Sequence, residues 1–240
     1  MKRCIKHLRL TKVSILLALV SASSSVLSSQ NAISASPAAS PIGEERILGV
    51  IPNYATVSNP HQQVTALTVE QKFQLFAKET FDPFTAASAA AGAAISQSDN
   101  DDPKYGYGSR AYAQRFGAAM ADMTSQSLFS DAVLAALLRE DPRYFRMGPE
   151  FPFWKRIGHA VLRVAETRTD AGRNTFNYAG ILGMSLGIGL SNAYYPAASV
   201  NGAEMAKRFG TSLAGAALFN ILPEFWPDVR QKLFHRKAKS

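Results

Sequence analysis

Apolar residues recur at steps of three and four positions through most of the chain after Leu67, the spacing that places them on one face of an α-helix. Phe73, Phe76, Ala77 and Thr80 form the clearest such face. The predicted helices run from Thr68 to Asp82, from Ala86 to Ile95, from Arg110 to Arg139, from Phe153 to Thr167, from Thr175 to Asn192 and from Gly202 to Leu222. Strand-like alternation is almost absent from the sequence. The pattern therefore predicts an all-α fold, a compact bundle of five or six helices.

Polar residues at fixed offsets predict where these helices begin. Thr68 and Gln71 have the spacing of a capping box, in which each side chain accepts a hydrogen bond from the backbone of the other residue. Asp82 precedes Pro83 as a cap precedes the first residue of a helix. Ser109 is the predicted cap of the longest helix.

Other residues predict where the helices break or end. Ser130 and Asp131 favour a break or kink within the longest helix, and Asp141–Pro142 is its predicted end. Pro223 and Pro227 are predicted to interrupt the last helix, because proline has no backbone N–H to donate.

The first 45 residues lack this helical pattern. Five Lys or Arg residues within residues 1–12 precede the apolar run Val13–Val20, and small residues follow it. This order is typical of a secretory signal peptide, predicted over residues 1–30 with cleavage between residues 22 and 35. An uncleaved N-terminal anchor is the alternative. Residues 31–45, rich in Ser, Ala and Pro, are predicted to be a disordered linker.

The rest of the chain is divided into a single helical domain over residues 46–229 and a basic tail over residues 230–240. The domain begins with RILGVIPNY, residues 46–54, which is interpreted as an extended arm because Pro52 disfavours helix at Ile51. It could be a single short strand or lie in a groove. An exported protein of this kind is predicted to lie in the periplasm or outer envelope of a bacterium.

Composition argues against several kinds of site. The single cysteine, Cys4, precedes the apolar run, so no lipidation, disulfide or thiolate site is predicted after cleavage. Five of the 26 basic residues lie in the first 12 positions and five in the last 11, which leaves 16 between them against 18 acidic residues. The net charge of +8 thus belongs to the ends, and no nucleic-acid partner is predicted. No metal or cofactor is predicted, because the histidines and glycines lack the required spacings.

The stretch GILGMSLGIGL, residues 180–190, has three interpretations, of which the first is helix packing. Ala179, Gly183, Gly187 and Ser191 fall four positions apart, a stripe of small residues that lets a second helix approach closely. Each interior glycine costs a helix about 1 kcal/mol, which a close contact would offset. The predicted partner stripes are Gly210 with Ala214, Thr211 with Gly215, or Ala86, Ala90 and Ala94.

A membrane span is the second interpretation of this stretch. The continuously apolar part is only Ile181–Leu190, which at about 1.5 Å per residue covers roughly half of a bilayer core of about 30 Å. Asn177 and Asn192 lie close to its two ends. The packing interpretation is therefore preferred.

A serine hydrolase is the third interpretation. Gly183–Gly187 matches G-x-S-x-G around Ser185, and Ser185, Asp228 and His235 follow the chain order of a catalytic triad. A nucleophile elbow needs a strand before the serine, and the preceding segments are predicted to be helical. The hydrolase is kept as the alternative function.

A polar ligand site is predicted on the helix over Phe153–Thr167. His159, Arg163 and Glu166 fall at positions i, i+4 and i+7 of this helix, and Arg143 lies nearby in sequence. Together they are candidates for binding an anion or a polar ligand. The alternative is a face of solvated or inter-helix ion pairs.

The C-terminal segment combines aromatic and basic residues. Trp226, Arg230, Lys232 and Phe234 are candidates for contact with a membrane surface. The alternative is a helix end docked on the bundle with a solvated charged tail. The predicted partners are an anionic membrane surface, another envelope protein or a second copy of the chain.

The segments DPRYF (141–145), SNAYYP (191–196) and EFWPD (224–228), with the leader and RILGVIPNY, resemble a group of exported bacterial proteins of unknown function. The resemblance covers about residues 46–229; it implies export and carries no catalytic residues. Within DPRYF, Asp and Pro are predicted to close the long helix, Arg to stay in water, and Tyr and Phe to enter the core. The sequence predicts a structural or binding role at the cell envelope, with peripheral membrane association.

Overall fold

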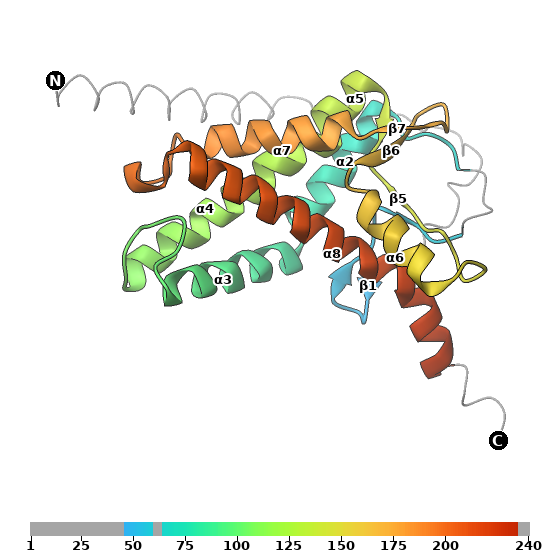
Figure 1. The fold of residues 1–240 in the computed structure, drawn as a ribbon, viewed down its shortest axis with the longest axis horizontal. Helices are drawn as coiled ribbons and strands as arrows, with labels where there is room; N and C mark the ends of the chain where they lie inside the picture. Colours follow the sequence, from blue (N-terminus) through green and yellow to red (C-terminus); the bar gives the residue numbers. More distant parts are fainter. Residues whose placement is uncertain (1–45, 60–63, 235–240) are drawn as a thin grey trace, which may run out of the picture. The chain divides into compact units, whose positions relative to one another are not determined.

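Helices make up most of the structure, a computed structural model that describes residues 46–59 and 64–234 (Figure 1). The helical elements are α2 (Val69–Thr80), α3 (Pro83–Ser98), α4 (Ser109–Ser127), the π-helix η1 (Leu128–Leu134), α5 (Ala135–Leu138), α6 (Phe153–Leu162), α7 (Tyr178–Ser191), the 3₁₀ turn η2 (Ala197–Ser199) and α8 (Gly202–Phe234). The predicted helical character is confirmed. The predicted signal peptide, linker and His235 lie outside the described residues, as does the side chain of Phe234.

Short strands precede and connect the helices, and only the extended segment over residues 46–54 is predicted to contain one. They are β1 (Arg46–Ile47), β2 (Ile51–Pro52), β3 (Thr56–Val57), β4 (Glu140–Asp141), β5 (Tyr144–Phe145), β6 (Glu166–Thr169) and β7 (Asn174–Phe176). β1 and β2 form an antiparallel pair, β3 and β5 a parallel pair, and β4, β6 and β7 an antiparallel sheet in the order β4-β6-β7. The described fold is a helical bundle with small sheet elements, rather than strictly all-α.

The helix predicted to reach Thr167 is shorter than expected. α6 ends at Leu162, and the chain continues into β6. Thr167 and Thr169 are β-branched, which favours a pleated strand over a helix. Gly172 has φ 78° in the turn that returns the chain as β7. Glu166 consequently lies on a strand, so the predicted face of one continuous helix is wrong.

Two of the three predicted helix starts are confirmed. Thr68 and Gln71 form the capping box at the start of α2, with Gln71 N donating to Thr68 Oγ1 at 3.2 Å. Asp82 caps α3, accepting from Phe84 N at 2.8 Å. The expectation for Ser109 is wrong: the cap of α4 is Gly108, with φ 97° and no side-chain hydrogen bond.

The longest predicted helix is divided in the structure. The predicted irregularity at Ser130–Asp131 is confirmed, since both residues lie in η1, where the helix widens to π geometry. The helix then ends at Leu138, because Arg139 adopts the left-handed region with φ 56°. Asp141–Pro142 is therefore not the stop: Asp141 already belongs to β4.

α8 continues through both of its prolines, so the predicted interruption is wrong. It runs from Gly202 to Phe234 with Pro223 and Pro227 inside it. Between them, the carbonyl of Glu224 accepts from Arg146 Nε at 2.7 Å and from Arg156 Nη2 at 2.6 Å. Two side chains from other elements thus bind the backbone of α8 between its two prolines.

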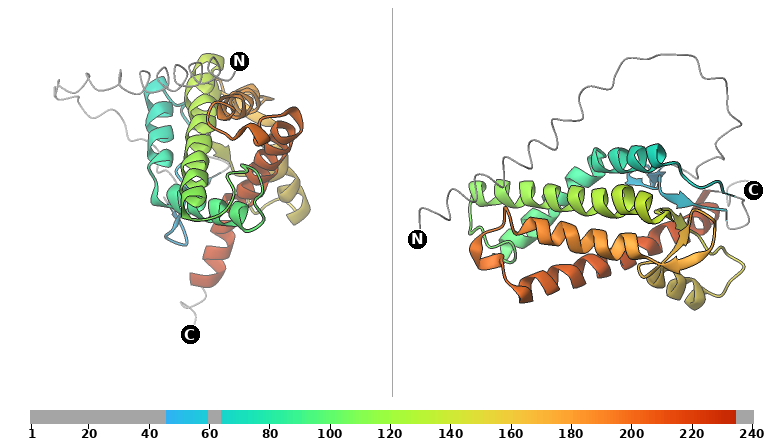
Figure 2. Two further views of the ribbon diagram at one scale, coloured as in Figure 1. Left: turned by 90° about the vertical axis from the view of Figure 1, so that its left-hand side faces the viewer. Right: turned by 90° about the horizontal axis from the view of Figure 1, so that it is seen from above.

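The small-residue stripe of α7 is confirmed as a packing surface. Ala179, Gly183, Gly187 and Ser191 are all buried. A Cβ on Gly183 would come within 2.5 Å of Ser130 Cα. The stripe therefore lies against η1 and the end of α4, and α7 runs beside α4 in Figure 2.

The partner of this stripe differs from each of the three predicted ones. Gly210 and Gly215 of α8 have open space where a Cβ would lie, and the buried positions of α3 are Ala89 and Ala93. Within the described ranges, no helix has both the length and the apolar composition needed to cross a bilayer.

A buried carboxylate fastens two distant segments to α8. Glu224 is 0% exposed, and its Oε2 accepts from Tyr144 Oη at 2.8 Å and from Met147 N at 2.9 Å. Its Oε1 accepts from Gly148 N at 3.3 Å and from Arg156 Nε at 2.8 Å. Each oxygen of Glu224 therefore has two donors, as a buried charge requires.

Asp228, one turn further along α8, balances the charges of this network. Arg146 Nη2 donates to one oxygen of Asp228, and Arg156 Nη1 lies 2.6 Å from the other. Two carboxylates thus face two guanidinium groups. We call Tyr144, Arg146, Arg156, Glu224 and Asp228 the Glu224 network.

Candidate ligand-binding cavities

The larger of two adjoining cavities lies between the N-terminal segment 52–56, α2, α4, η1 and α8, and its volume is about 390 Å³. Most of its lining is apolar and includes Leu75, Phe84, Met123, Phe219 and Pro223. Glu79 and Asp131 also line it, whereas no Lys, Arg or His residue does so among the described residues. Mostly apolar cavities of this size with a few polar groups are typical of small-molecule sites.

Glu79 is placed at the cavity by the last turn of α2. Its carboxyl group accepts no hydrogen bond and forms no ion pair with any residue in the described ranges. Burial, followed by the nearby charges of Asp131 and Asp82, raises the pKa of Glu79 to about 8. The side chain therefore retains its proton at neutral pH unless a positive charge joins it.

Asp131 is placed by the π-helical geometry of η1. Its Oδ2 accepts from Ser127 Oγ at 2.7 Å, one of the few polar contacts available to it. Burial raises the pKa of Asp131, and hydrogen bonds from Ser127 and Ser130 offset part of that rise. The charge of Asp131 is one cause of the raised pKa of Glu79, so ionisation of one acid disfavours ionisation of the other.

Thr80 adds a third polar group to the same wall. It is 8% exposed, and its hydroxyl has no hydrogen-bond partner among the described residues. A buried hydroxyl without a partner costs free energy, which a polar atom of a bound ligand would recover.

The smaller cavity, of about 270 Å³, adjoins the larger one. Asp131, Pro142, Tyr144 and Asn220 line both cavities. The smaller cavity is also lined by Glu140, Asp141, Arg143 and Arg163. Its charged groups therefore include bases, in contrast to those of the larger cavity.

The structure brings together two of the four predicted ligand-binding residues. Arg143 and Arg163 both line the smaller cavity. His159 lies outside it, with Nε2 at 2.9 Å from the carbonyl oxygen of Phe145. Glu166 is exposed on β6.

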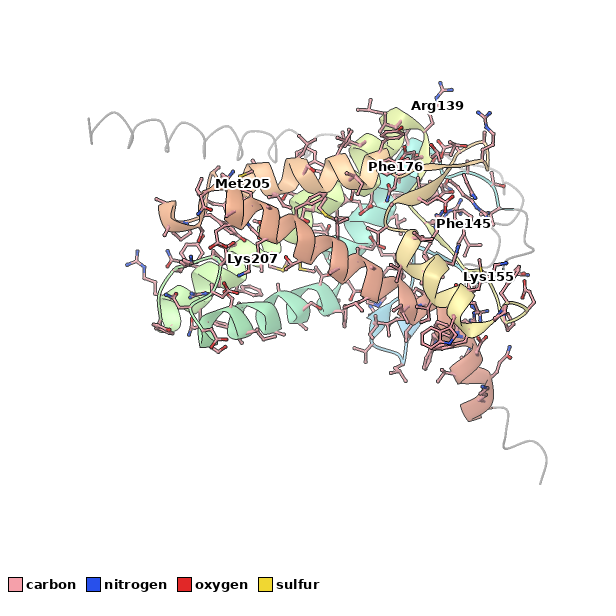
Figure 3. All side chains as sticks on the ribbon, viewed as in Figure 1. Arg139, Phe145, Lys155, Phe176, Met205 and Lys207 are labelled. Atoms are coloured by element: carbon pink, nitrogen blue, oxygen red, sulfur yellow. The ribbon has the colours of Figure 1, made fainter. Side chains whose placement is uncertain are left out.

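Arg143 is engaged by its own loop rather than by water, which corrects the expectation for DPRYF. Its Nη2 lies 2.6 Å from Asp141 Oδ2, and the side chain is mostly buried. Tyr144 and Phe145 enter the core as predicted, with 8% and 7% exposure. Arg143, Arg163 and Arg168 surround the ring of Phe145, the residue labelled beside α6 and the β6–β7 hairpin in Figure 3.

The predicted catalytic triad is not assembled in the described part of the chain. Ser185 lies in the middle of α7, where its Oγ donates to the carbonyl of Ile181 at 2.8 Å. The residues before it are helical, so the strand-to-helix turn of a nucleophile elbow does not occur there. Asp228 is engaged by Arg146 and Arg156 in the Glu224 network.

The predicted membrane-surface residues fall into two groups. Trp226 is buried, at 9% exposure, and so forms part of the core rather than a surface. Arg230 and Lys232 are exposed on the last turns of α8. Among residues 46–59 and 64–234, no three His, Cys, Asp or Glu side chains are placed to hold a metal ion.

Sequence reasoning missed Glu79 and Asp131. Glu79 follows Lys78 on a helix and looks like an ordinary solvated position, and Asp131 was noticed only as a helix breaker. The usable signal for Asp131 is that it is one of only two acidic residues, with Asp122, inside the longest predicted helix; Glu79 has no such signal. Comparisons with protein-family models, curated proteins and solved structures found no match. The cavities and their charges are therefore the basis for inferring function.

Proposed function

We propose that this chain is an exported binding protein of the bacterial envelope, and that its larger cavity holds a small amphiphilic cation, an amine with an apolar body. The observation that carries the proposal is the pair Glu79 and Asp131 in a cavity that no described basic residue lines. The proposed export rests on the leader pattern of residues 1–30.

A cation suits this pair of acids for an electrostatic reason. In an apolar cavity two nearby carboxylates cannot both ionise, because burial and mutual repulsion disfavour the charged forms. A bound ammonium group would supply the missing positive charge and form charge-assisted hydrogen bonds to the carboxylates. Thr80 Oγ1 is placed on the same wall to accept a further N–H.

An apolar body suits the remainder of the cavity. Leu75, Phe84, Met123 and Phe219 present hydrocarbon surface to it. Burying each methylene group of a ligand against such a wall is worth about 0.8 kcal/mol. A short alkylamine would therefore gain binding free energy from its ammonium group at the acids and from its hydrocarbon chain at the apolar wall.

The test is calorimetric titration of the purified chain with hexylamine and with hexanol, which has the same body and no charge. We expect hexylamine to bind more tightly, and Glu79→Gln to weaken its binding about tenfold or more without affecting hexanol. Glu70→Gln is the matched control, because Glu70 lies exposed in the first turn of the same helix. Equal binding of the two compounds, or full hexylamine affinity in Glu79→Gln, would refute the proposal.

A further inference from the structure

The guanidinium group of Arg163 is a second buried ionisable group that lines a cavity and has no hydrogen bond or ion pair among the described residues. Arg163 lies at the C-terminal cap of α6 and is 8% exposed. Its Nε has no hydrogen-bond partner, and no described residue forms an ion pair with it. A guanidinium group has five N–H donors in a fixed fork, so it is costly to bury without acceptors.

Two of the three acids that line the same cavity, Glu140 and Asp141, are already engaged; the third is Asp131. Asp141 accepts from Arg143 Nε at 2.9 Å and from Arg143 Nη2 at 2.6 Å. Glu140 Oε2 accepts from Ala179 N at 3.0 Å, at the start of α7. Neither carboxylate is hydrogen-bonded to Arg163, although all four side chains line this cavity.

Electrostatics point in the same direction as geometry. Burial lowers the pKa of Arg163, and the nearby charge of Arg168 lowers it further. The charges of Glu166 and Asp141 offset part of this lowering, so the unmet need of the site is for hydrogen-bond acceptors at a buried guanidinium group. A planar anion would supply them, since two of its oxygens can accept parallel N–H donors of one guanidinium group.

We propose that Arg163 binds a carboxylate group in the smaller cavity, and that the ligand of this protein is an amino carboxylate whose two charged ends occupy the two adjoining cavities. This inference rests on the proposed function for the amine end. Asp131, Pro142, Tyr144 and Asn220 line both cavities, so one ligand can lie along them. The ends of such a ligand are opposite in charge to the groups that they would meet, with its ammonium at Glu79 and Asp131 and its carboxylate at Arg163.

Three compounds with the same six-carbon body separate the two ends: hexylamine, hexanoate and 6-aminohexanoate. We expect 6-aminohexanoate to bind the full chain about tenfold more tightly than hexylamine, because it engages both cavities. In Arg163→Gln this advantage should disappear while hexylamine affinity is retained. Arg168→Gln is the matched control, since Arg168 also lies over the Phe145 ring, at 4.3 Å, and does not line the smaller cavity.

Arg163→Lys is a second variant that keeps the test informative if Arg163→Gln fails to fold. Lysine keeps the positive charge and loses the fork, so we expect 6-aminohexanoate to lose several-fold in affinity and to remain better than hexylamine. Equal affinity of 6-aminohexanoate and hexylamine for the wild-type chain would overturn the inference. Retention of the advantage in Arg163→Gln would also overturn it.

Hexanoate and inorganic phosphate distinguish failure of this inference from failure of the proposed function. Hexanoate binding that requires Arg163 and survives Glu79→Gln supports the carboxylate site by itself. If hexylamine then fails to bind, the proposed amine site is wrong and the two-ended ligand falls with it. Phosphate that binds more tightly than hexanoate, in an Arg163-dependent manner, would overturn the assignment of a carboxylate.

Discussion

Glu224 and Glu79 are both glutamates in the interior of the same bundle, yet their surroundings are opposite. Glu224 receives two donors on each carboxylate oxygen and faces two arginines, whereas Glu79 receives none and faces a second acid. A buried charge that is completely satisfied by its own chain has no capacity left for a ligand. An unsatisfied one that borders a cavity does, which is why we assign binding to Glu79 and structure to Glu224.

The two regions meet at Tyr144. Its hydroxyl donates to Glu224 Oε2 at 2.8 Å, while the residue also lines both cavities. The satisfied network thereby fixes one wall of the unsatisfied site. Rigid support of this kind keeps a binding group in place before the ligand arrives.

The largest effect on stability should come from disrupting the Glu224 network. Glu224→Gln would leave Arg146 and Arg156 with one acid instead of two in a buried site. We expect a loss of about 3–5 kcal/mol in the free energy of unfolding, measured by urea denaturation. A loss below about 1 kcal/mol would show that Glu224 does not play the structural role assigned to it.

The next effect concerns the support of Asp131 by α7. Gly183→Ala would place a Cβ 2.5 Å from Ser130 Cα, next to Asp131 in η1. We expect about 1–3 kcal/mol of destabilisation from overpacking, together with weaker hexylamine binding. Gly189→Ala on the same helix is the control: that position has open space, so alanine should stabilise by up to about 1 kcal/mol. Equal effects of the two substitutions would contradict the close contact.

A smaller effect on stability should appear as a pH dependence caused by Glu79. The pKa of Glu79 is raised by burial to about 8, so the folded chain keeps a proton that the unfolded chain releases above about pH 4.3. Stability should therefore fall as pH rises toward 8 and level off above it. Glu79→Gln should remove this decline and be about 1–2 kcal/mol more stable than wild type at pH 8, because solvent screens part of the cost at a half-buried carboxyl.

Thermal melts of both proteins between pH 5 and pH 9 measure this difference. Glu70→Gln should follow the wild-type curve, because its carboxyl is exposed. A wild-type stability that rises between pH 5 and pH 8 in step with the Glu79→Gln variant would contradict the raised pKa.

The smallest effect should come from a residue outside both regions. Ser185→Ala removes a hydroxyl that donates to the Ile181 carbonyl on an exposed face of α7. We expect a change within about 0.5 kcal/mol, in the stabilising direction, because alanine is the better helix former. Binding of hexylamine should not change. An esterase activity of the wild-type chain that vanished in this variant would restore the hydrolase alternative.

Local signals predicted the parts of the fold that depend on local physics. The capping box at Thr68 and the cap at Asp82 need only neighbours along the chain, and both occur as predicted. The small-residue stripe at Gly183 could be predicted for the same reason. Its partner could not, because such a stripe indicates close helix packing without indicating which helix packs against it. The strand β6 was missed because it pairs with residues 140–141, far earlier in the sequence.

The candidate site depended almost entirely on such distant pairings. Arg163 was identified as a ligand-binding candidate through a helical face shared with Glu166, although the helix ends before either residue. Glu79 and Asp131 lie on α2 and η1, and only the packing of these elements shows that each lacks a base. Sequence patterns show which residues are charged and how they are spaced, whereas the hydrogen bonds and ion pairs of each residue are known only from the folded chain.

The pairing of β3 with β5 has a consequence for kinetics. Thr56 meets Tyr144, and Arg46 meets Asp82, so the segment that walls the larger cavity can dock only after much later residues have been placed. Contacts of such long sequence separation form late because a long loop must close first, and a pair only two residues long has few hydrogen bonds to resist opening. Hydrogen exchange should thus be faster at the amides of Tyr144 and Arg146, which donate to the carbonyls of Ala55 and Val57, than in α7. Each transient opening would uncover the cavity, so the frequency of opening would set the upper limit on how fast a ligand exchanges.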